Sequence, residues 1–159
     1  LIKNVQDAQS CVSMLDYPPK GSRGWGPFIA HSRWSVDLLD YKKAYGEGCV
    51  CILLIETIEA VQNIYDICEV DGVDAVFVAK FDLSTALGVS GQFDHIDFIS
   101  AITRIEDAAK KTKTPLGGGP VRDKVEFNEY CKRGYQLFAN FDVLRLKQSV
   151  HENLSWRNF

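Results

Sequence analysis

Short apolar runs alternate with amphipathic segments from about residue 49 onward. The runs over residues 49–55 and 74–79 are rich in Val and Ile and have the length of buried strands. Between them, residues 57–69 carry apolar side chains at helical spacing, as do residues 96–111 and 123–133. A third strand is expected to enter at Pro115-Leu116 and a fourth to run over residues 136–141, before a last helical segment. Strands joined through helices must be parallel, so the pattern predicts four consecutive βα units.

The first 48 residues follow a different pattern. Asn4 can cap a helix over residues 5–15, which Pro18-Pro19 would end. Residues 17–34 are rich in glycine and proline but also carry aromatic side chains, which predicts an ordered loop and not a linker. A short helix is expected over residues 35–45.

Four βα units form either an open doubly wound α/β sheet or one side of a (β/α)₈ barrel. Complete barrels run to about 250 residues, and this chain has 159. Length alone therefore favours the open sheet. Since the sequence contains no repeat, low-complexity stretch or internal boundary, residues 1–159 are expected to form a single domain.

Composition narrows the class of partner. The chain has 18 Lys and Arg against 21 Asp and Glu and a net charge of −3, so it lacks the basic surface of a nucleic-acid binder. No apolar stretch approaches the roughly 20 residues of a membrane span. The first residues also lack the sectors of a signal peptide, so we expect a cytoplasmic protein with a small-molecule partner.

The cysteines follow no spacing typical of zinc sites or disulfide scaffolds. They lie inside expected helices and strands, so we expect free thiols in the core. The five positions are Cys11, Cys49, Cys51, Cys68 and Cys131.

Two acidic residues follow the first two strands. Glu56 comes directly after residues 49–55, and Asp82 comes shortly after residues 74–79. Neighbouring parallel strands end at the same edge of a sheet, where α/β proteins bind their ligands. Two carboxylates at that edge predict a site for a hard divalent cation and an oxygen-rich substrate. The alternative is that each acid caps the helix that follows it.

Several separated motifs, in order and in register, favour the barrel over the open sheet. They are Tyr17-Pro18-Pro19-Lys20-Gly21-Ser22-Arg23-Gly24, Ser32-Arg33-Trp34, Ile55-Glu56-Thr57-Ile58-Glu59-Ala60-Val61, Val70-Asp71-Gly72-Val73-Asp74, Phe81-Asp82-Leu83-Ser84 and Leu87-Gly88. The series resembles the HpcH/HpaI aldolase family over nearly the whole chain, to about Val150. That resemblance implies a (β/α)₈ TIM barrel of which this chain is the C-terminal half, strands 5–8. The chain would then begin at the end of the fourth strand, as an N-terminally incomplete domain. Family members often exchange a C-terminal helix between subunits, so a homo-oligomer is expected.

The same resemblance implies an activity. Glu56 and Asp82 would bind Mg²⁺, or Mn²⁺ or Co²⁺ in its place, and the backbone N–H groups of Phe81 and Asp82 would hold the substrate carboxylate. The ion would stabilise a pyruvate enolate as a carbon–carbon bond breaks or forms. The expected partners are a 2-keto acid, pyruvate or oxaloacetate, and an aldehyde. The family's catalytic histidine and arginine lie on the first barrel strands, so no residue of this chain is assigned those roles.

The sequence also allows two alternatives to an aldolase. The family includes macrophomate synthase, which decarboxylates oxaloacetate to the same kind of enolate and forms a carbon–carbon bond. The other alternative is a non-catalytic domain that keeps the fold for assembly or binding. The chain also departs from the family pattern near the site, with Leu54 where a glutamine is usual and Ala79-Lys80 where a Gly-Pro pair is usual.

Weaker candidates surround this site. By strand parity Lys80 should face the same interior as Asp82, where its amine would form either a Schiff base with substrate or an ion pair with Asp82. Arg23 is a candidate substrate contact, with a structural salt bridge as the alternative. Residues Gly117-Gly118-Gly119 are either a phosphate-binding loop or a flexible turn. His31 and His95 are expected in loops, as solvated or capping residues.

Overall fold

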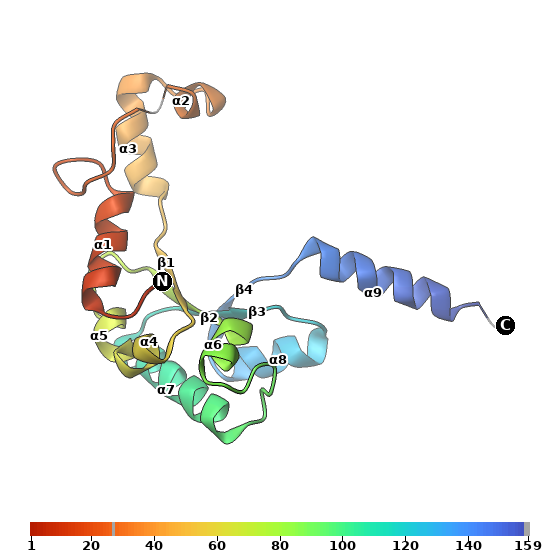
Figure 1. The fold of residues 1–159 in the computed structure, drawn as a ribbon. Helices are drawn as coiled ribbons and strands as arrows, with labels where there is room; N and C mark the ends of the chain where they lie inside the picture. The colour runs from red at the N-terminus through yellow and green to blue at the C-terminus, as the bar shows by residue number, and fades with distance from the viewer. Residues whose placement is uncertain (27, 158–159) are drawn as a thin grey trace.

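The computed structural model describes residues 1–26 and 28–157. Position 27, inside the loop expected over residues 17–34, lies outside the described residues, as do the last two positions. The described chain contains a parallel sheet of four strands in the order β1-β2-β3-β4 (Figure 1). The strands are β1 Ile52–Ile55, β2 Ala75–Ala79, β3 Leu116–Gly119 and β4 Tyr135–Phe138. The predicted succession of parallel strands is therefore confirmed.

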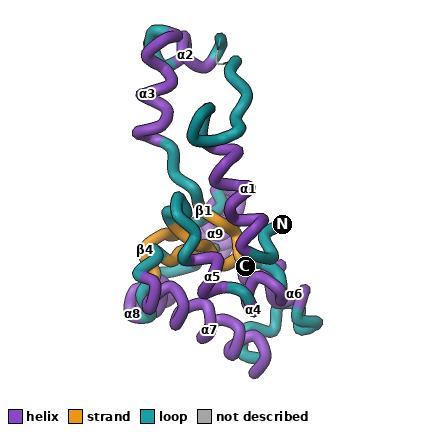
Figure 2. The backbone as a smooth tube through the Cα atoms, turned by 90° about the vertical axis from the view of Figure 1, so that its left-hand side faces the viewer, coloured by secondary structure: helices purple, strands orange, loops and turns teal. Residues whose placement is uncertain are grey.

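One face of the sheet carries the core. Leu53, Ile55, Val76 and Val78 alternate with more accessible neighbours and are buried, as expected where a strand has one covered face. The helices on this side are α4 Ile58–Gln62, α5 Ile64–Cys68, α7 Ile96–Thr112 and α8 Lys124–Lys132 (Figure 2). Helix α7 supplies a buried stripe that includes Ile105, so the amphipathic pattern of residues 96–111 is explained by packing against the sheet.

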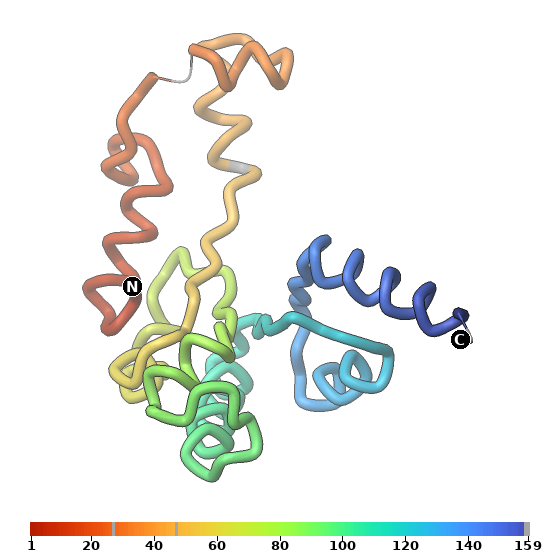
Figure 3. Tube along the Cα trace, turned by 45° about the vertical axis from the view of Figure 1, so that its right-hand side comes forward, coloured from red at the N-terminus to blue at the C-terminus, as the bar shows by residue number. Residues whose placement is uncertain are grey.

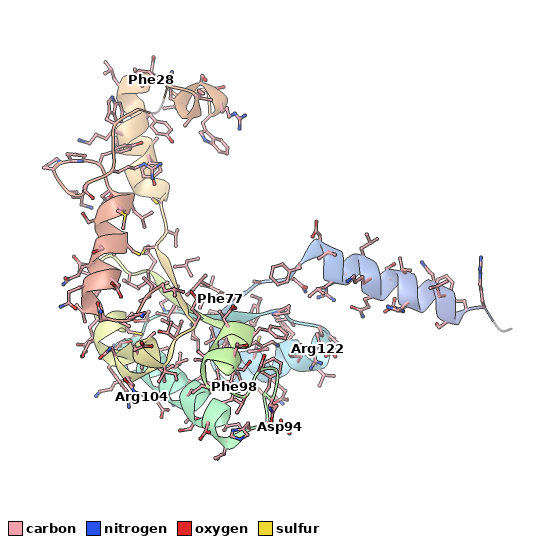
Figure 4. All side chains as sticks on the ribbon, viewed as in Figure 1. Phe28, Phe77, Asp94, Phe98, Arg104 and Arg122 are labelled. Carbon is pink, nitrogen blue, oxygen red and sulfur yellow. The ribbon has the colours of Figure 1, made fainter. Side chains whose placement is uncertain are left out.

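The opposite face of the sheet is open in the described part of the chain. Ile52 and Leu54 of β1 are each nearly half exposed, at 46% and 48%. Phe77 of β2, labelled in Figure 4, is only partly buried, although Val76 and Val78 beside it are buried. An apolar inner face of this kind is what a segment of a closed barrel presents toward its remaining strands.

Three elements differ from the sequence predictions. The helix expected over residues 57–69 is divided at Asn63, whose side-chain amide donates to the carbonyls of Lys3 and Glu59. The loop expected after β2 contains helix α6 Lys80–Ala86, which begins directly at the end of the strand. The helix expected over residues 35–45 lies at Leu38–Gly48 and is α3.

Glycines 117 to 119 are strand β3 and not a turn. A Cβ atom at Gly118 would lie 2.7 Å from Cε1 of Tyr135, and one at Gly119 would lie 2.5 Å from the carbonyl oxygen of Ala139. At Gly117 a Cβ would overlap the ring of Phe77. The glycines allow close approach of the neighbouring strand and side chains, so the hypotheses of a phosphate-binding loop and of a flexible turn are both wrong.

Two extensions project from the sheet (Figure 3). The first holds α1 Val5–Leu15, α2 Ala30–Arg33 and α3. The predicted Asn4 cap of α1 is confirmed, because its side chain accepts a hydrogen bond of 3.0 Å from the N–H of Asp7. Helix α2 is an addition within the expected loop.

The second extension is α9 Asp142–Ser155, which has no buried residue. Its apolar side chains are exposed; they are Val143, Leu144, Leu146, Val150 and Leu154. The expected homo-oligomer stays a prediction.

The thiols are free, but only some of them lie in the core. Cys51 and Cys68 are buried, and burial raises the pKa of both. Cys131 is exposed, so the expectation of core thiols is wrong at that position. Among the described helices, none combines the length and the apolar character that crossing a bilayer requires.

Candidate functional site

Glu56 stands at the carboxyl end of β1, immediately before the residue that caps α4. That cap is Thr57, whose Oγ1 accepts from the N–H of Ala60 at 3.1 Å and donates to the carbonyl of Ile2 at 3.2 Å. Glu56 is half-buried, and its carboxylate forms no hydrogen bond or ion pair with any described residue. Helix capping therefore does not account for Glu56.

Asp82 lies in the first turn of α6. The N-cap of this helix is Ala79, which has no side-chain acceptor, so Asp82 is not a cap either. Its carboxylate is exposed and has no hydrogen bond or ion pair within the described chain. The N–H groups of Phe81 and Asp82 belong to the first turn of a helix, which has no carbonyl of its own for them to reach. These groups are thus available to an acceptor outside the helix.

The far side of α6 is held in the core. Leu83 and Ser84 are fully buried. The hydroxyl of Ser84 donates to the carbonyl of Phe81 at 2.8 Å and accepts from the N–H of Gly91 at 3.0 Å. This packing orients the first turn of α6 with Phe81 and Asp82 toward solvent.

Strand pairing places Glu56 and Asp82 at one edge of the sheet. Strands β1 and β2 are adjacent, and Ile55 pairs with Val78 at their ends. Glu56 follows the first of these residues directly, and Asp82 follows the second by one short turn. Among the described residues, no group of three His, Cys, Asp or Glu side chains could hold a metal.

A pair of carboxylates fits a hard divalent cation. Mg²⁺ is commonly bound through one or two carboxylates, with water and substrate oxygens completing its octahedral shell. A zinc site would need three or four nitrogen, sulfur or carboxylate ligands from the protein. The donor chemistry of these two carboxylates therefore suits Mg²⁺ or Mn²⁺.

Lys80 forms its ion pair with Glu126 and not with Asp82. It starts α6 instead of continuing β2, so the strand parity used for the prediction does not apply. Its Nζ lies 3.2 Å from Oε1 of Glu126 and 3.3 Å from the carbonyl oxygen of Pro120. The expected ion pair with Asp82 is wrong, and Glu126 takes its place.

A cavity of about 610 Å³ adjoins this ion pair on the helix-covered side of the sheet. Aromatic side chains line much of it, including Phe93, Phe98 and Tyr130. Figure 4 labels Phe98 on α7 and Arg122 beside α8, on either side of this region. The Lys80 amine is therefore enclosed by α6, α7 and α8 and not by the open face of the sheet.

Arg23 and His95 also have structural partners. The guanidinium of Arg23 lies over the rings of Tyr17 and Tyr45, at 5.5 and 4.7 Å from their centroids, and a hydrogen bond to Tyr17 raises the pKa of Arg23. These contacts are aromatic, so the expected salt bridge is not what holds Arg23 in the described chain. His95 caps α7 by accepting from the N–H of Asp97, as its capping interpretation expects. His31 lies in α2, so its expected place in a loop is wrong.

Glu126, the partner of Lys80, is a residue that the sequence pattern did not single out. Its Oε2 accepts from the backbone N–H of Arg122 at 2.7 Å and from Nε of the same residue at 3.2 Å. The spacing of Arg122 and Glu126, four residues apart at a helix start, is the local signal that could have suggested a pair. No sequence pattern near Glu126 could have suggested its contact with Lys80, which lies 46 residues earlier in the chain.

Acid is expected to weaken the contacts of Glu126. Burial acts to raise the pKa of Glu126, but the backbone and side-chain hydrogen bonds from Arg122 and the charge of Lys80 outweigh it, and the pKa is lowered. The stabilisation is therefore complete above the ordinary carboxyl pKa and is lost as the pH falls through the lowered value.

Urea unfolding measures this linkage. The midpoint of the parent chain should fall more steeply than that of Glu126→Gln as the pH is lowered from about 5 to about 3. Parallel pH profiles for the two proteins would show that Glu126 does not contribute to acid sensitivity.

The sequence of this chain matches a known protein family and a curated enzyme. The family model described as HpcH/HpaI aldolase/citrate lyase matches residues 1–141. A 4-hydroxy-2-oxo-heptane-1,7-dioate aldolase of Salmonella paratyphi B is 36% identical over 103 residues, which are 64% of this chain and 39% of the relative. The chain thus spans well under half the length of this curated relative.

Solved structures agree with the fold. An HpcH/HpaI aldolase/citrate lyase family protein from Burkholderia cenocepacia superposes with a TM-score of 0.88 at 26% identity, covering 98% of this chain and 62% of that protein. Macrophomate synthase superposes with a TM-score of 0.83 at 21% identity, covering 98% of this chain and 55% of the enzyme, which is a likeness of fold alone. The predicted fold class, one half of a (β/α)₈ barrel, is confirmed.

Proposed function

Because this chain belongs to the HpcH/HpaI aldolase/citrate lyase family, we propose that it contributes the metal-binding half of a divalent-metal-dependent lyase. The enzyme would cleave or form a carbon–carbon bond of a 2-keto acid. One observation carries this proposal: Glu56 and Asp82, at the ends of adjacent parallel strands, have carboxylates without a partner among the described residues.

Each residue of the site has a proposed role. Glu56 and Asp82 hold the cation, with Mg²⁺ favoured and Mn²⁺ or Co²⁺ as substitutes. The bound ion supplies Lewis-acid stabilisation of negative charge on the keto oxygen of the substrate. The N–H groups of Phe81 and Asp82 donate hydrogen bonds to the substrate carboxylate, as preorganised donors do for developing anions. The ring of Phe81 packs edge to face against that of Phe93, with 5.1 Å between the centroids.

The name of one relative supports the proposed substrate class. A 4-hydroxy-2-oxo acid, the class named for the Salmonella enzyme, breaks between C3 and C4 to give pyruvate and an aldehyde. The electron pair of that bond moves toward the keto group while the 4-hydroxyl gives its proton to a base. We assign no residue of this chain to that base, because the motif resemblance puts the catalytic histidine and arginine on other barrel strands. Pyruvate and an aldehyde are the proposed partners.

Ternary binding tests the proposal. Oxalate has the shape and charge of the pyruvate enolate, so isothermal titration should show that oxalate binds only when Mg²⁺ or Mn²⁺ is present. Binding of oxalate without metal, or the absence of any ternary complex, would contradict the lyase and favour a non-catalytic domain. If metal-dependent binding is found, release of CO₂ from oxaloacetate without aldol cleavage would identify the decarboxylase instead.

A further inference from the structure

Lys80 is a buried cation with defined partners. Its side chain is 10% exposed, and that of Glu126 is 17% exposed. The ammonium contacts Glu126 and the carbonyl of Pro120 on one side. On the other side it lies 5.3 Å from the ring centroid of Phe93 and 5.8 Å from that of Tyr130, within the range of cation–π attraction. Removing the charge would leave these groups without their common partner.

Glu126 connects Lys80 to the segment that follows β3. One carboxylate oxygen accepts from Lys80, and the other accepts twice from Arg122. The carbonyl of Arg122 in turn accepts from Nη1 of Arg145 at 2.9 Å, and the carbonyl of Val121 accepts from Asn140 at 2.7 Å. Polar contacts therefore run along the carboxyl ends of β2, β3 and β4.

This network begins in the same helical turn as Asp82. Lys80 is the first residue of α6 and Asp82 the third, in a helix of seven residues. Leu83 and Ser84 anchor the later part of the helix, as described above. At its beginning the N-cap Ala79 makes no side-chain hydrogen bond, whereas Lys80 hydrogen-bonds to Glu126 and to the carbonyl of Pro120.

We infer that Lys80, through its ion pair with Glu126, is a positioning residue that holds the first turn of α6 and thereby sets the place of Asp82 and of the Phe81 and Asp82 N–H groups. The expected effect on cation binding rests on the proposed function, but the expected effect on the stability of the first turn of α6 does not. A helix start that is free to shift would move a cation ligand and two anion donors together.

Two measurements on the 159-residue chain test the inference. In the metal-free protein, Lys80→Met should speed amide hydrogen exchange in residues 80–86 by about tenfold, because this turn opens more easily. With Mn²⁺ as the probe, the same variant should raise the dissociation constant by about tenfold, the low end of what loss of a supporting contact costs a metal site. Glu126→Gln should act in the same direction. The double variant should be little worse than either single one, because both remove one contact.

Matched variants separate this role from general destabilisation. Lys132→Met removes an exposed lysine that pairs with Glu129 on α8, and it should leave both readouts unchanged. Lys80→Arg keeps the charge and should recover most of the protection. If Lys80→Met unfolds the chain, as circular dichroism would show, Glu126→Gln alone decides the question.

The possible failures are distinct. A parent chain that binds no Mn²⁺ counts against the proposed function, while hydrogen exchange still tests the tether. The inference would be overturned if amide exchange in residues 80–86 were the same in Lys80→Met as in the Lys132→Met control, whatever the result with Mn²⁺. If Lys80→Met does not fold, the same comparison is made with Glu126→Gln.

Discussion

Replacing Glu56 or Asp82 with its amide is expected to weaken divalent-cation binding strongly and to leave the fold intact. Each carboxylate lies at the end of one of two adjacent strands and has no protein partner in the described chain, so folding does not depend on its charge. A neutral amide is a much weaker ligand for a hard cation than a carboxylate. The dissociation constant for Mn²⁺ should rise by more than about 100-fold, beyond the effect of losing a supporting contact.

Mn²⁺ titration followed by electron paramagnetic resonance measures this effect, with thermal unfolding as the check on the fold. Glu59→Gln is the matched control, because Glu59 lies three residues from Glu56 and its only ion pair among the described residues is an exposed contact of 3.7 Å with Lys3. The control should bind Mn²⁺ like the parent. Unchanged affinity in Glu56→Gln or Asp82→Asn would mean that the ion, if it binds, is held elsewhere.

Gly119→Ala is expected to destabilise the sheet by about 1–3 kcal/mol, the usual cost of overpacking. The added Cβ would lie 2.5 Å from the carbonyl oxygen of Ala139 and 3.2 Å from its carbonyl carbon. Both are backbone atoms of the segment that follows β4, so relief requires the two strand ends to separate. Urea unfolding should show a lower midpoint with an unchanged slope.

Gly24→Ala provides the comparison for this substitution. No heavy atom lies within 4 Å of a Cβ built at Gly24, so its effect on the free energy of unfolding should stay within about 0.5 kcal/mol. If Gly119→Ala were as stable as Gly24→Ala, the close approach of β3 to the segment after β4 would be wrong.

Local patterns predicted the elements whose causes are local. Asn4 caps α1 through its own side chain, and the apolar stripe of α7 packs on the sheet as its spacing predicts. Helix α6 was missed because it starts without a capping side chain at Ala79 and continues directly from the strand. The pattern there contains neither a break nor a cap, which are the signals that mark a helix start in a sequence.

The glycines of β3 could not be interpreted correctly from the local sequence. A run of glycines usually indicates a turn, because glycine adopts conformations that other residues avoid. In this fold the cause is steric and lies far away in the sequence, with Phe77 against Gly117 and Tyr135 against Gly118. No window of sequence around residues 117–119 contains that information.

Some residues of the candidate site could be placed from the sequence and others could not. The order of strands and acids in the sequence was enough to place Glu56 and Asp82 at one edge, because parallel topology decides which ends meet. The partner of Lys80 could not be predicted, since Glu126 lies 46 residues further along the chain and meets it only through tertiary packing. Arg23 likewise contacts the rings of two tyrosines instead of an acidic side chain.

Anomalous diffraction from crystals grown with Mn²⁺ and oxalate tests the central claim most directly. We expect a manganese peak that is coordinated by oxygens of both Glu56 and Asp82, with oxalate completing the shell. A peak held by only one of these side chains, or by neither, would contradict it.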